Sequence, residues 1–198
     1  MNTNEFDYYL IARDGKFTSP LLMNDDEINS GGIAFLRRLN KVESEETIHL
    51  TFNPPIPQKP DMTDYLWLSG GGAVFSKSVF NILKDVDIKD FQLVSAKIKD
   101  NKGKEYSDYY IANSYRKFAF LDKDESEVDE IWEDGNWSGI EKMVIDEEEM
   151  AKVPLEERLI YRSEENTTYC FYHKSIVDLI MSTNPTGIKF ISVEDWEN

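Results

Sequence analysis

A pattern that recurs at a spacing of 97 residues is the strongest constraint on the fold of this chain. Residues 74–95 and 171–192 align without a gap, and each reads as an apolar strand end, Lys-Ser, an apolar helical stripe, a turn and a strand. Each copy therefore predicts a strand–helix–strand unit whose helix packs its stripe on a sheet. The sequence predicts an α+β fold with mixed, mainly antiparallel sheets and a few short helices, in which this unit could be a duplication.

The Lys-Ser pair of the first copy follows a glycine run and resembles a phosphate-binding loop. Residues 71–78 fall one residue short of G-x-x-x-x-G-K-[ST], and Phe75 and Ser76 stand where the backbone would have to approach a phosphate. The second copy has Lys-Ser at 174–175 without preceding glycines, so the pair belongs to a strand–helix junction. We predict that Ser76 caps a helix and that residues 70–72 form a tight turn or bulge, so a nucleotide site is not expected.

Periodicity predicts the remaining elements. Strands are expected at 6–12, 46–52, 91–99, 105–113, 140–145, 159–162, 168–172 and 188–193. Helices are expected at 77–86, 146–152 and 174–181, with a shorter one within 25–40. Residues 100–103 are polar, contain a glycine and predict a hairpin loop between two of these strands.

Four prolines between residues 53 and 61 exclude both a helix and a central strand from that segment. This extended connector is the predicted boundary between an N-terminal strand-rich region, residues 1–60, and an α+β domain, residues 61–198. The two regions could also form one continuous domain, since 198 residues suffice for one well-filled core or two small ones.

Charge is the main feature of the composition, with 38 acidic and 22 basic residues and a net charge of −16. Residues 122–165 hold 17 acidic and 5 basic side chains, so this segment carries −12 of that charge. Such a field repels nucleic acid and anionic membranes and favours a basic protein partner. The single cysteine and the lack of a long apolar run predict a cytoplasmic protein rather than a secreted or membrane-spanning one.

The chain offers no residue pattern typical of catalysis or metal binding. Residues 122–133 resemble a calcium loop, but Glu127 stands where its sharp turn requires glycine. His49 is expected on the polar face of a strand, His173 at a helix start, and Cys170 as a small buried apolar group. We therefore predict no catalytic residue, no cofactor and no metal.

The segment around Trp132 and Trp137 is the candidate contact surface. Acidic side chains surround two tryptophans in a loop that contains glycine, and tryptophan is enriched among residues that anchor protein interfaces. The same tryptophans could instead fill a small core of their own. The predicted partner-binding residues are Asp124, Glu125, Asp129, Glu130, Trp132, Glu133, Asp134 and Trp137.

A series of short motifs between residues 64 and 195 resembles a family of bacterial immunity proteins, immunity-protein family eleven of polymorphic toxin systems. The motifs are Ala73–Lys77 before an amphipathic helix, Tyr109–Asn113, Ala119–Asp122, Ile140–Asp146, Leu159–Arg162 and Thr186–Phe190. The resemblance implies a cytoplasmic protein that neutralises a cognate secreted toxin by binding it. It implies no catalytic residues.

The sequence therefore leaves three functions open. The first is an immunity protein that forms a stoichiometric, non-catalytic complex with a toxin. The alternative is a small-ligand-binding protein or an enzyme that uses a pocket between the N-terminal third and the rest of the chain. A structural or regulatory interaction module unrelated to toxins is the third.

Overall fold

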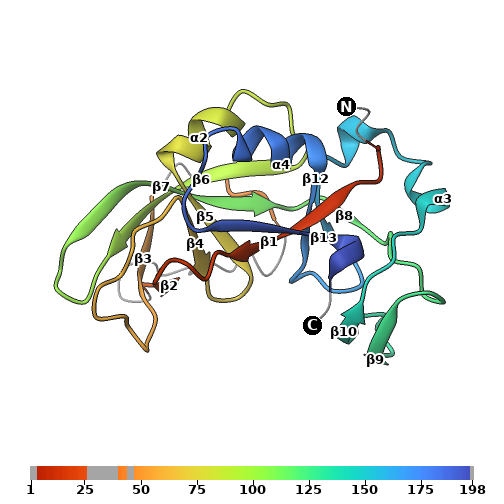
Figure 1. Ribbon diagram of the computed structural model, residues 1–198, viewed down its shortest axis with the longest axis horizontal. Coiled ribbons are helices and arrows are strands. Elements are labelled where there is room, and N and C mark those ends of the chain that lie inside the picture. Colours follow the sequence, from red (N-terminus) through yellow and green to blue (C-terminus); the bar gives the residue numbers. More distant parts are fainter. Residues whose placement is uncertain (1–3, 26–39, 44–46, 197–198) are drawn as a thin grey trace.

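The computed structural model describes residues 4–25, 40–43 and 47–196 of the chain. The short helix predicted within 25–40 lies almost entirely outside these residues. Two large sheets and a separate hairpin make up the strand structure (Figure 1). The predicted α+β class, with mainly antiparallel strands and few helices, is confirmed.

Six strands close into a barrel in the order β2-β3-β6-β7-β5-β4. Most pairs in it are antiparallel, whereas β2 with β4 and β3 with β6 are parallel. The strands are β2 (Leu21–Asn24), β3 (Ile48–Phe52), β4 (Tyr65–Leu68), β5 (Gly72–Ser76), β6 (Phe91–Lys99) and β7 (Glu105–Ser114). Inward-facing aliphatic residues such as Leu22, Leu50, Leu66 and Ile98 fill the barrel, because strand side chains alternate between its two faces.

A second sheet has the strand order β13-β1-β12-β11-β8. Its strands are β1 (Tyr8–Arg13), β8 (Lys117–Phe118), β11 (Ile160–Ser163), β12 (Cys170–His173) and β13 (Ile188–Ser192). The remaining strands, β9 (Glu127–Ile131) and β10 (Trp137–Lys142), form a two-stranded sheet of their own within the described part of the chain. The helices of the described residues are α2 (Lys77–Leu83), α3 (Glu147–Met150) and α4 (Lys174–Met181), with 3₁₀ turns η1 (Leu155–Glu157) and η2 (Val193–Asp195).

The 97-residue repeat has a structural counterpart. In the first copy β5, α2 and β6 follow one another, and β7 lies between the two strands, antiparallel to both. In the second copy β12, α4 and β13 follow one another, and β1 lies between the strands in the same way. Both copies are thus split strand–helix–strand units, although the two lie in different sheets.

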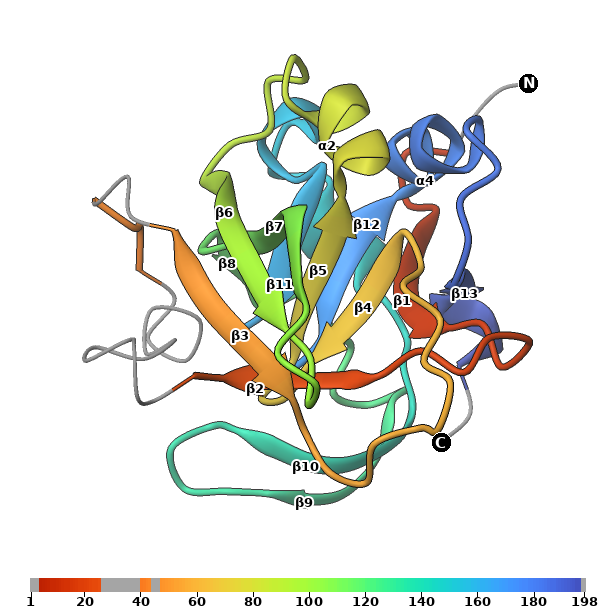
Figure 2. The same ribbon diagram turned by 90° about the vertical axis from the view of Figure 1, so that its left-hand side faces the viewer.

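Helices α2 and α4 pack against each other over the two sheets, as Figures 1 and 2 show. Val79 and Leu83 of α2 share one apolar cluster with Ile176 and Ile180 of α4. These residues belong to the helical stripes that the repeat predicted. The helices of the two copies therefore pack together where the two sheets meet. Among the described residues, no helix has the length and apolar character that crossing a bilayer requires.

The proline connector contains no helix or strand, as predicted. Strands from both sides of it pair within both sheets: β2 and β3 with β4 and β6, and β1 with β12 and β13. The division of the chain at residue 60 stays a prediction.

Several local predictions need correction. Helix α2 ends at Leu83 rather than at residue 86, and the strand predicted at 140–145 spans 137–142 instead. Strand β2 had no clear alternating pattern and was not predicted. Ser76 occupies the N-cap position, but its hydroxyl donates to a carboxylate oxygen of Asp64 at 2.6 Å and caps no helical N–H.

The glycine run forms the turn between β4 and β5, as predicted. Gly70 and Gly71 have φ angles of +93° and +89°, which L-residues with side chains rarely adopt. The Gly71 N–H donates to the carbonyl of Leu68 at 3.2 Å and closes the turn. The run therefore shapes a β-hairpin.

Candidate functional site

Residues 127–142 of the acidic segment fold into the antiparallel β9–β10 hairpin at one end of the molecule (Figure 1). Its turn is closed by the N–H of Trp132, which donates to the carbonyl of Asn136 at 2.8 Å, and by the N–H of Gly135, which donates to the carbonyl of Trp132 at 2.9 Å. Gly135 has a φ of +86°, the left-handed conformation that such a turn requires. The sequence predicted an acidic loop here, so strand β9 is a correction: charged residues can form an exposed strand when a partner strand satisfies their backbone.

Most of the predicted contact residues lie on or beside this hairpin and are exposed. Asp129 and Glu130 lie on β9, whereas Glu133 and Asp134 lie in its turn. Asp124 and Glu125 precede β9 in a turn whose two N–H groups donate to one carboxylate oxygen of Asp122. Within the described chain, none of these six carboxylates lies within 4.0 Å of a basic side chain.

The two tryptophans of the segment have opposite surroundings. Trp132 has 51% of its surface exposed, and its indole N–H donates to Glu130 at 2.8 Å. Trp137 has only 3% exposed and packs with Ile140 and Phe171 in an apolar cluster beneath the hairpin. Trp137 therefore fills a core, the alternative that the sequence left open, and cannot serve as an exposed anchor in this conformation.

A buried carboxylate holds the base of the hairpin. Glu165 accepts hydrogen bonds from the N–H of Leu121 at 2.8 Å and from the hydroxyl of Ser163 at 2.6 Å. The carbonyl of Glu165 accepts from the N–H of Trp137 at 2.6 Å, at the start of β10. Glu165 was not predicted as a site residue; its sequence signal is an acidic residue two positions after the end of a strand.

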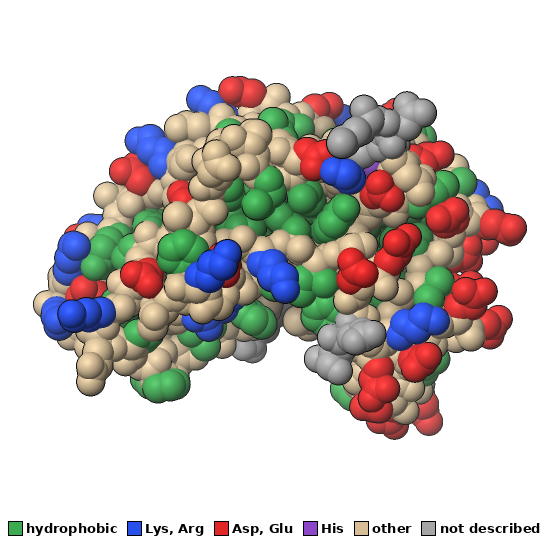
Figure 3. Space-filling model, viewed as in Figure 1, with side chains coloured by type: hydrophobic (Ala, Val, Ile, Leu, Met, Phe, Trp, Pro, Cys, Tyr) green, Lys and Arg blue, Asp and Glu red, His purple; other side chains and the backbone are tan. Residues whose placement is uncertain are grey.

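The geometry of the turn also keeps its acidic group charged. The N–H of Asn136 donates to Asp134 at 3.0 Å, and this hydrogen bond lowers the pKa of the Asp134 carboxyl below its ordinary value. Figure 3 shows acidic side chains gathered over the end of the molecule that carries β9 and β10. The hairpin thus presents negative charge around one exposed tryptophan.

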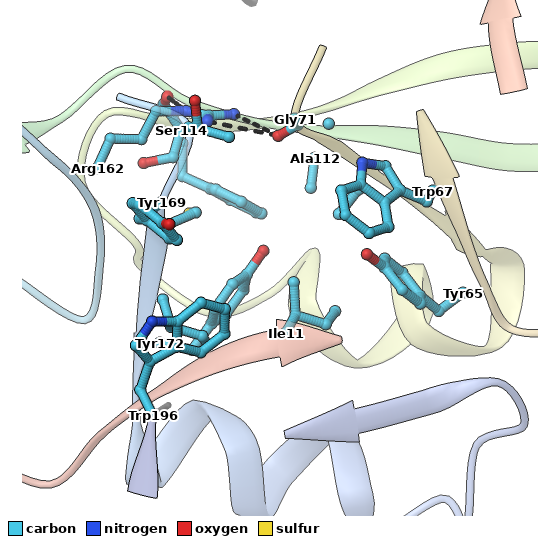
Figure 4. A pocket seen from close by; sticks show the side chains of 16 residues that line it. Ile11, Tyr65, Trp67, Gly71, Ala112, Ser114, Arg162, Tyr169, Tyr172 and Trp196 are labelled. Atoms are coloured by element: carbon cyan, nitrogen blue, oxygen red, sulfur yellow. Dashed lines mark hydrogen bonds between the residues drawn. The ribbon is translucent and has the colours of Figure 1, made fainter. Parts of the chain in front are cut away.

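A second candidate site is a pocket of about 270 Å³ where the two sheets meet (Figure 4). Leu10 and Ile11 of β1 line it from the N-terminal third of the chain, together with residues from β4, β5, β7 and β12. Its walls are mainly aromatic and aliphatic, and the buried Arg162 lies at one side. A pocket of this position was expected for the small-ligand alternative, although that alternative favoured a polar one.

The histidines and the cysteine are not assembled into a catalytic group. His173 is the N-cap of α4, as predicted, and its Nδ1 accepts from the N–H of Ser175 at 3.2 Å. His49 is half-buried on β3 in the barrel. Cys170 is half-buried and lines the pocket, where burial raises the pKa of its thiol and so disfavours the reactive thiolate.

Comparison with known proteins places the chain in a family. Residues 5–195 match the model of the Immunity protein family (Imm11), which is nearly the whole chain. The chain therefore belongs to this immunity protein family, and the resemblance noted in the sequence is confirmed. No curated protein matches the chain.

Proposed function

We propose that this protein is a cytoplasmic immunity protein that binds one cognate secreted toxin and blocks it without catalysis. Membership of the immunity family supports a toxin as partner. The exposed Trp132 and the six exposed carboxylates that lie on or beside the β9–β10 hairpin are the observation that carries the choice of surface. We exclude Trp137 from that surface because it is buried.

The toxin is proposed to be basic at the surface that it presents. Uncompensated carboxylates on a protruding hairpin raise the rate of encounter with a cationic partner, and this steering weakens as salt is added. The exposed ring of Trp132 supplies the apolar anchor that charge alone lacks, since hot spots of interfaces are enriched in tryptophan. Many intercellular toxins act on nucleic acid and are basic, so an acidic inhibitor suits such a site.

The first experiment is a pull-down from lysate and secreted fractions of the native organism at low and moderate salt, followed by mass spectrometry. We expect one basic, toxin-like protein whose retention falls as salt rises. Retention of a toxin without salt sensitivity would keep the function and discard the acidic surface. Recovery of no toxin would contradict the proposal.

The surface is then tested with the purified pair by stopped-flow kinetics. Reversing Glu130, Glu133 and Asp134 to lysine should slow association by about tenfold or more at low salt, because steering changes on-rates by 10–10³. A matched control reverses Asp85, Glu148 and Glu156, which are also exposed and change the net charge equally. Equal slowing by both triple variants would show that only the net charge matters, and no slowing would remove the hairpin from the interface.

The aromatic anchor has a matched control as well. Trp132→Ala should raise the dissociation rate of the complex, whereas Trp67→Ala should not, although Trp67 is also exposed, with 42% of its surface free. Both residues are exposed, so neither variant should disturb the core. The opposite pattern would place the interface at the rim of the pocket, which Trp67 lines.

A further inference from the structure

We propose that the pocket between the two sheets binds an apolar group that carries one carboxylate. The pocket is lined by both sheets and measures about 270 Å³ (Figure 4). This inference goes beyond toxin neutralisation and does not depend on it, because the site is not part of the acidic hairpin.

A buried cation without an anion is the first observation. Arg162 has 3% of its surface exposed and lines the pocket. Its guanidinium donates to the carbonyls of Ser114 at 3.1 Å and Thr167 at 2.8 Å, but no carboxylate of the described residues lies within 4.0 Å of it. Removing a charge from water without a counter-ion is costly, so an anion in the pocket would offset that cost.

One arm of the guanidinium also has hydrogen-bonding capacity to spare. The only hydrogen bond of Nη2 within the described structure is to the carbonyl of Gly71 at 3.5 Å, which is at the outer limit for such a bond. Nη1 makes a contact of the same length to that carbonyl, and Figure 4 shows both as dashed lines. A guanidinium with free N–H groups is well suited to a planar carboxylate.

A second buried polar group lies beside this cation. Ser114 has 1% of its surface exposed and lines the pocket, and its hydroxyl has no hydrogen-bond partner among the described residues. Such orphaned hydroxyls are uncommon in protein interiors, since each costs free energy unless a partner is present. A ligand oxygen held by Arg162 could accept a hydrogen bond from Ser114 as well.

The other ionisable groups of the pocket do not neutralise the cation. Burial raises the pKa of Tyr65, Tyr169, Tyr172 and the Cys170 thiol, so all four are uncharged at neutral pH. Arg162 is therefore the single charge among them. A cationic ligand would be repelled, and a dianion such as a phosphate monoester would meet only one positive group.

The side chains that line the pocket determine the apolar part of the ligand. The aromatic rings of Tyr65, Trp67, Phe91, Tyr169, Tyr172 and Trp196 surround the pocket. Space exists between them because Ala73 and Ala112, which pair across β5 and β7, have small side chains. The volume is slightly below the roughly 300 Å³ at which drug-sized pockets begin, so one ring or a short hydrocarbon chain fits best.

Isothermal titration calorimetry at pH 7.5 with 3-phenylpropionate, 3-phenylpropan-1-ol and 3-phenylpropylamine tests the chemistry directly. The acid should bind about tenfold or more tightly than the alcohol, because hydrogen bonds to charged groups are about twice as strong as neutral ones. The amine should bind most weakly. No saturable binding of the acid, or equal binding of acid and alcohol, would overturn the proposal.

Variants assign that preference to Arg162. Arg162→Met keeps the length of the side chain and should bring the affinity for the acid down to that for the alcohol. Arg116→Met is the matched control, because Arg116 is paired with Asp90 and Glu157 outside the pocket and its loss should leave both affinities unchanged. If Arg162→Met does not fold, Trp67→Ala at the exposed rim should weaken binding of the acid and the alcohol alike, whereas Trp132→Ala should not; unchanged binding in Trp67→Ala would contradict the site.

A further titration, with a short peptide, distinguishes two possible sources of the carboxylate: the C-terminus of a protein chain and a free small molecule. N-acetylglycyl-phenylalanine carries its carboxylate as the C-terminal residue of a protein chain would, and its amide lacks that charge. Binding of the free peptide but not of the amide would identify a chain terminus as a source of this ligand. Binding of 3-phenylpropionate but of neither peptide would identify a free small molecule, and binding of none of them would refute the site.

Discussion

One short stretch of chain at the end of β11 buries two opposite charges, and the two have different surroundings. Glu165, at the base of the hairpin, accepts from the Leu121 N–H and the Ser163 hydroxyl, and both of its oxygens are engaged. Arg162, three residues earlier, lines the pocket, and its hydrogen-bond partners among the described residues are all carbonyl groups, one of them at 3.5 Å. The protein itself supplies hydrogen-bond donors to both oxygens of the Glu165 carboxylate, whereas the Arg162 guanidinium still has N–H groups that could donate to a ligand.

This difference indicates which buried charge serves the fold and which could serve binding. A buried ion whose hydrogen bonds are fully satisfied holds its neighbours in place, and its removal leaves them without partners. A buried ion with free donors adds less to stability, and replacing it by an apolar side chain of similar size can be neutral.

The largest effect is expected at Glu165. Glu165→Ala leaves the Leu121 N–H and the Ser163 hydroxyl buried without acceptors, which should lower the free energy of unfolding by about 2–4 kcal/mol, since each orphaned group costs about 1–3. Urea unfolding measures this value. The control Glu164→Ala removes an exposed neighbour and should change stability by less than about 0.5 kcal/mol. A similar small loss in both variants would remove Glu165 from its anchoring role.

Gly139→Ala should cause the next largest loss of stability. The structural change that causes it should lie within the β9–β10 hairpin. Gly139 has a φ of +58°, and an added Cβ would collide with the side chain of Asp129 on the paired strand. We expect a loss of about 1–3 kcal/mol in the free energy of unfolding, the usual cost of such strain. The double variant with Asp129→Ala should recover most of the part that is due to the collision, because alanine lacks the carboxylate atoms that the added Cβ would meet first and keeps only the Cβ of residue 129.

A second glycine of the hairpin, Gly135, allows the cost of backbone strain to be distinguished from the cost of the collision with Asp129. Gly135 also has a positive φ, but nothing lies within 4 Å of its added Cβ. Gly135→Ala should therefore cost less than Gly139→Ala. An equal or greater cost would show that backbone conformation, and not the Asp129 side chain, limits residue 139.

Arg162→Met should change stability less than Glu165→Ala does, and this comparison separates the two buried charges most directly. The methionine leaves the Ser114 and Thr167 carbonyls with fewer donors, but it also removes the cost of burying a cation. We expect a change of about 1 kcal/mol or less in urea unfolding. A loss as large as that of Glu165→Ala would make Arg162 a purely structural residue.

The smallest effect concerns a third buried group, His173, which the fold keeps neutral. Burial is the main cause that lowers the pKa of His173 below its ordinary value of 6.5. The unfolded chain therefore takes up a proton first, so stability is full above about pH 6.5 and falls as the pH drops from there toward the folded pKa. His173→Asn keeps a residue that can cap α4 and should lose less stability between pH 7.5 and 5.5 than the parent protein in urea unfolding. An equal loss in both proteins would assign the pH dependence to other groups.

Much of the secondary structure followed from local pattern. Helix α4, the β6–β7 hairpin and the glycine turn were predicted from periodicity and turn residues, because these features involve neighbours in the chain. Strand β9 was missed because its residues are charged, and only pairing with β10 satisfies its backbone. The predicted capping by Ser76 was wrong because its hydroxyl donates a hydrogen bond to Asp64, twelve residues away, and not to the helix.

The sequence by itself determined the α+β class, the repeated strand–helix–strand pattern and the concentration of negative charge in one segment, since each of these is a property of composition or of local order. Only the tertiary structure decided that Trp132 is exposed while Trp137 is buried, because that depends on how β10 packs on the core beneath it. The pocket is also a tertiary property. Its residues run from Leu10 to Trp196 and meet only where the two sheets join, which no local pattern encodes.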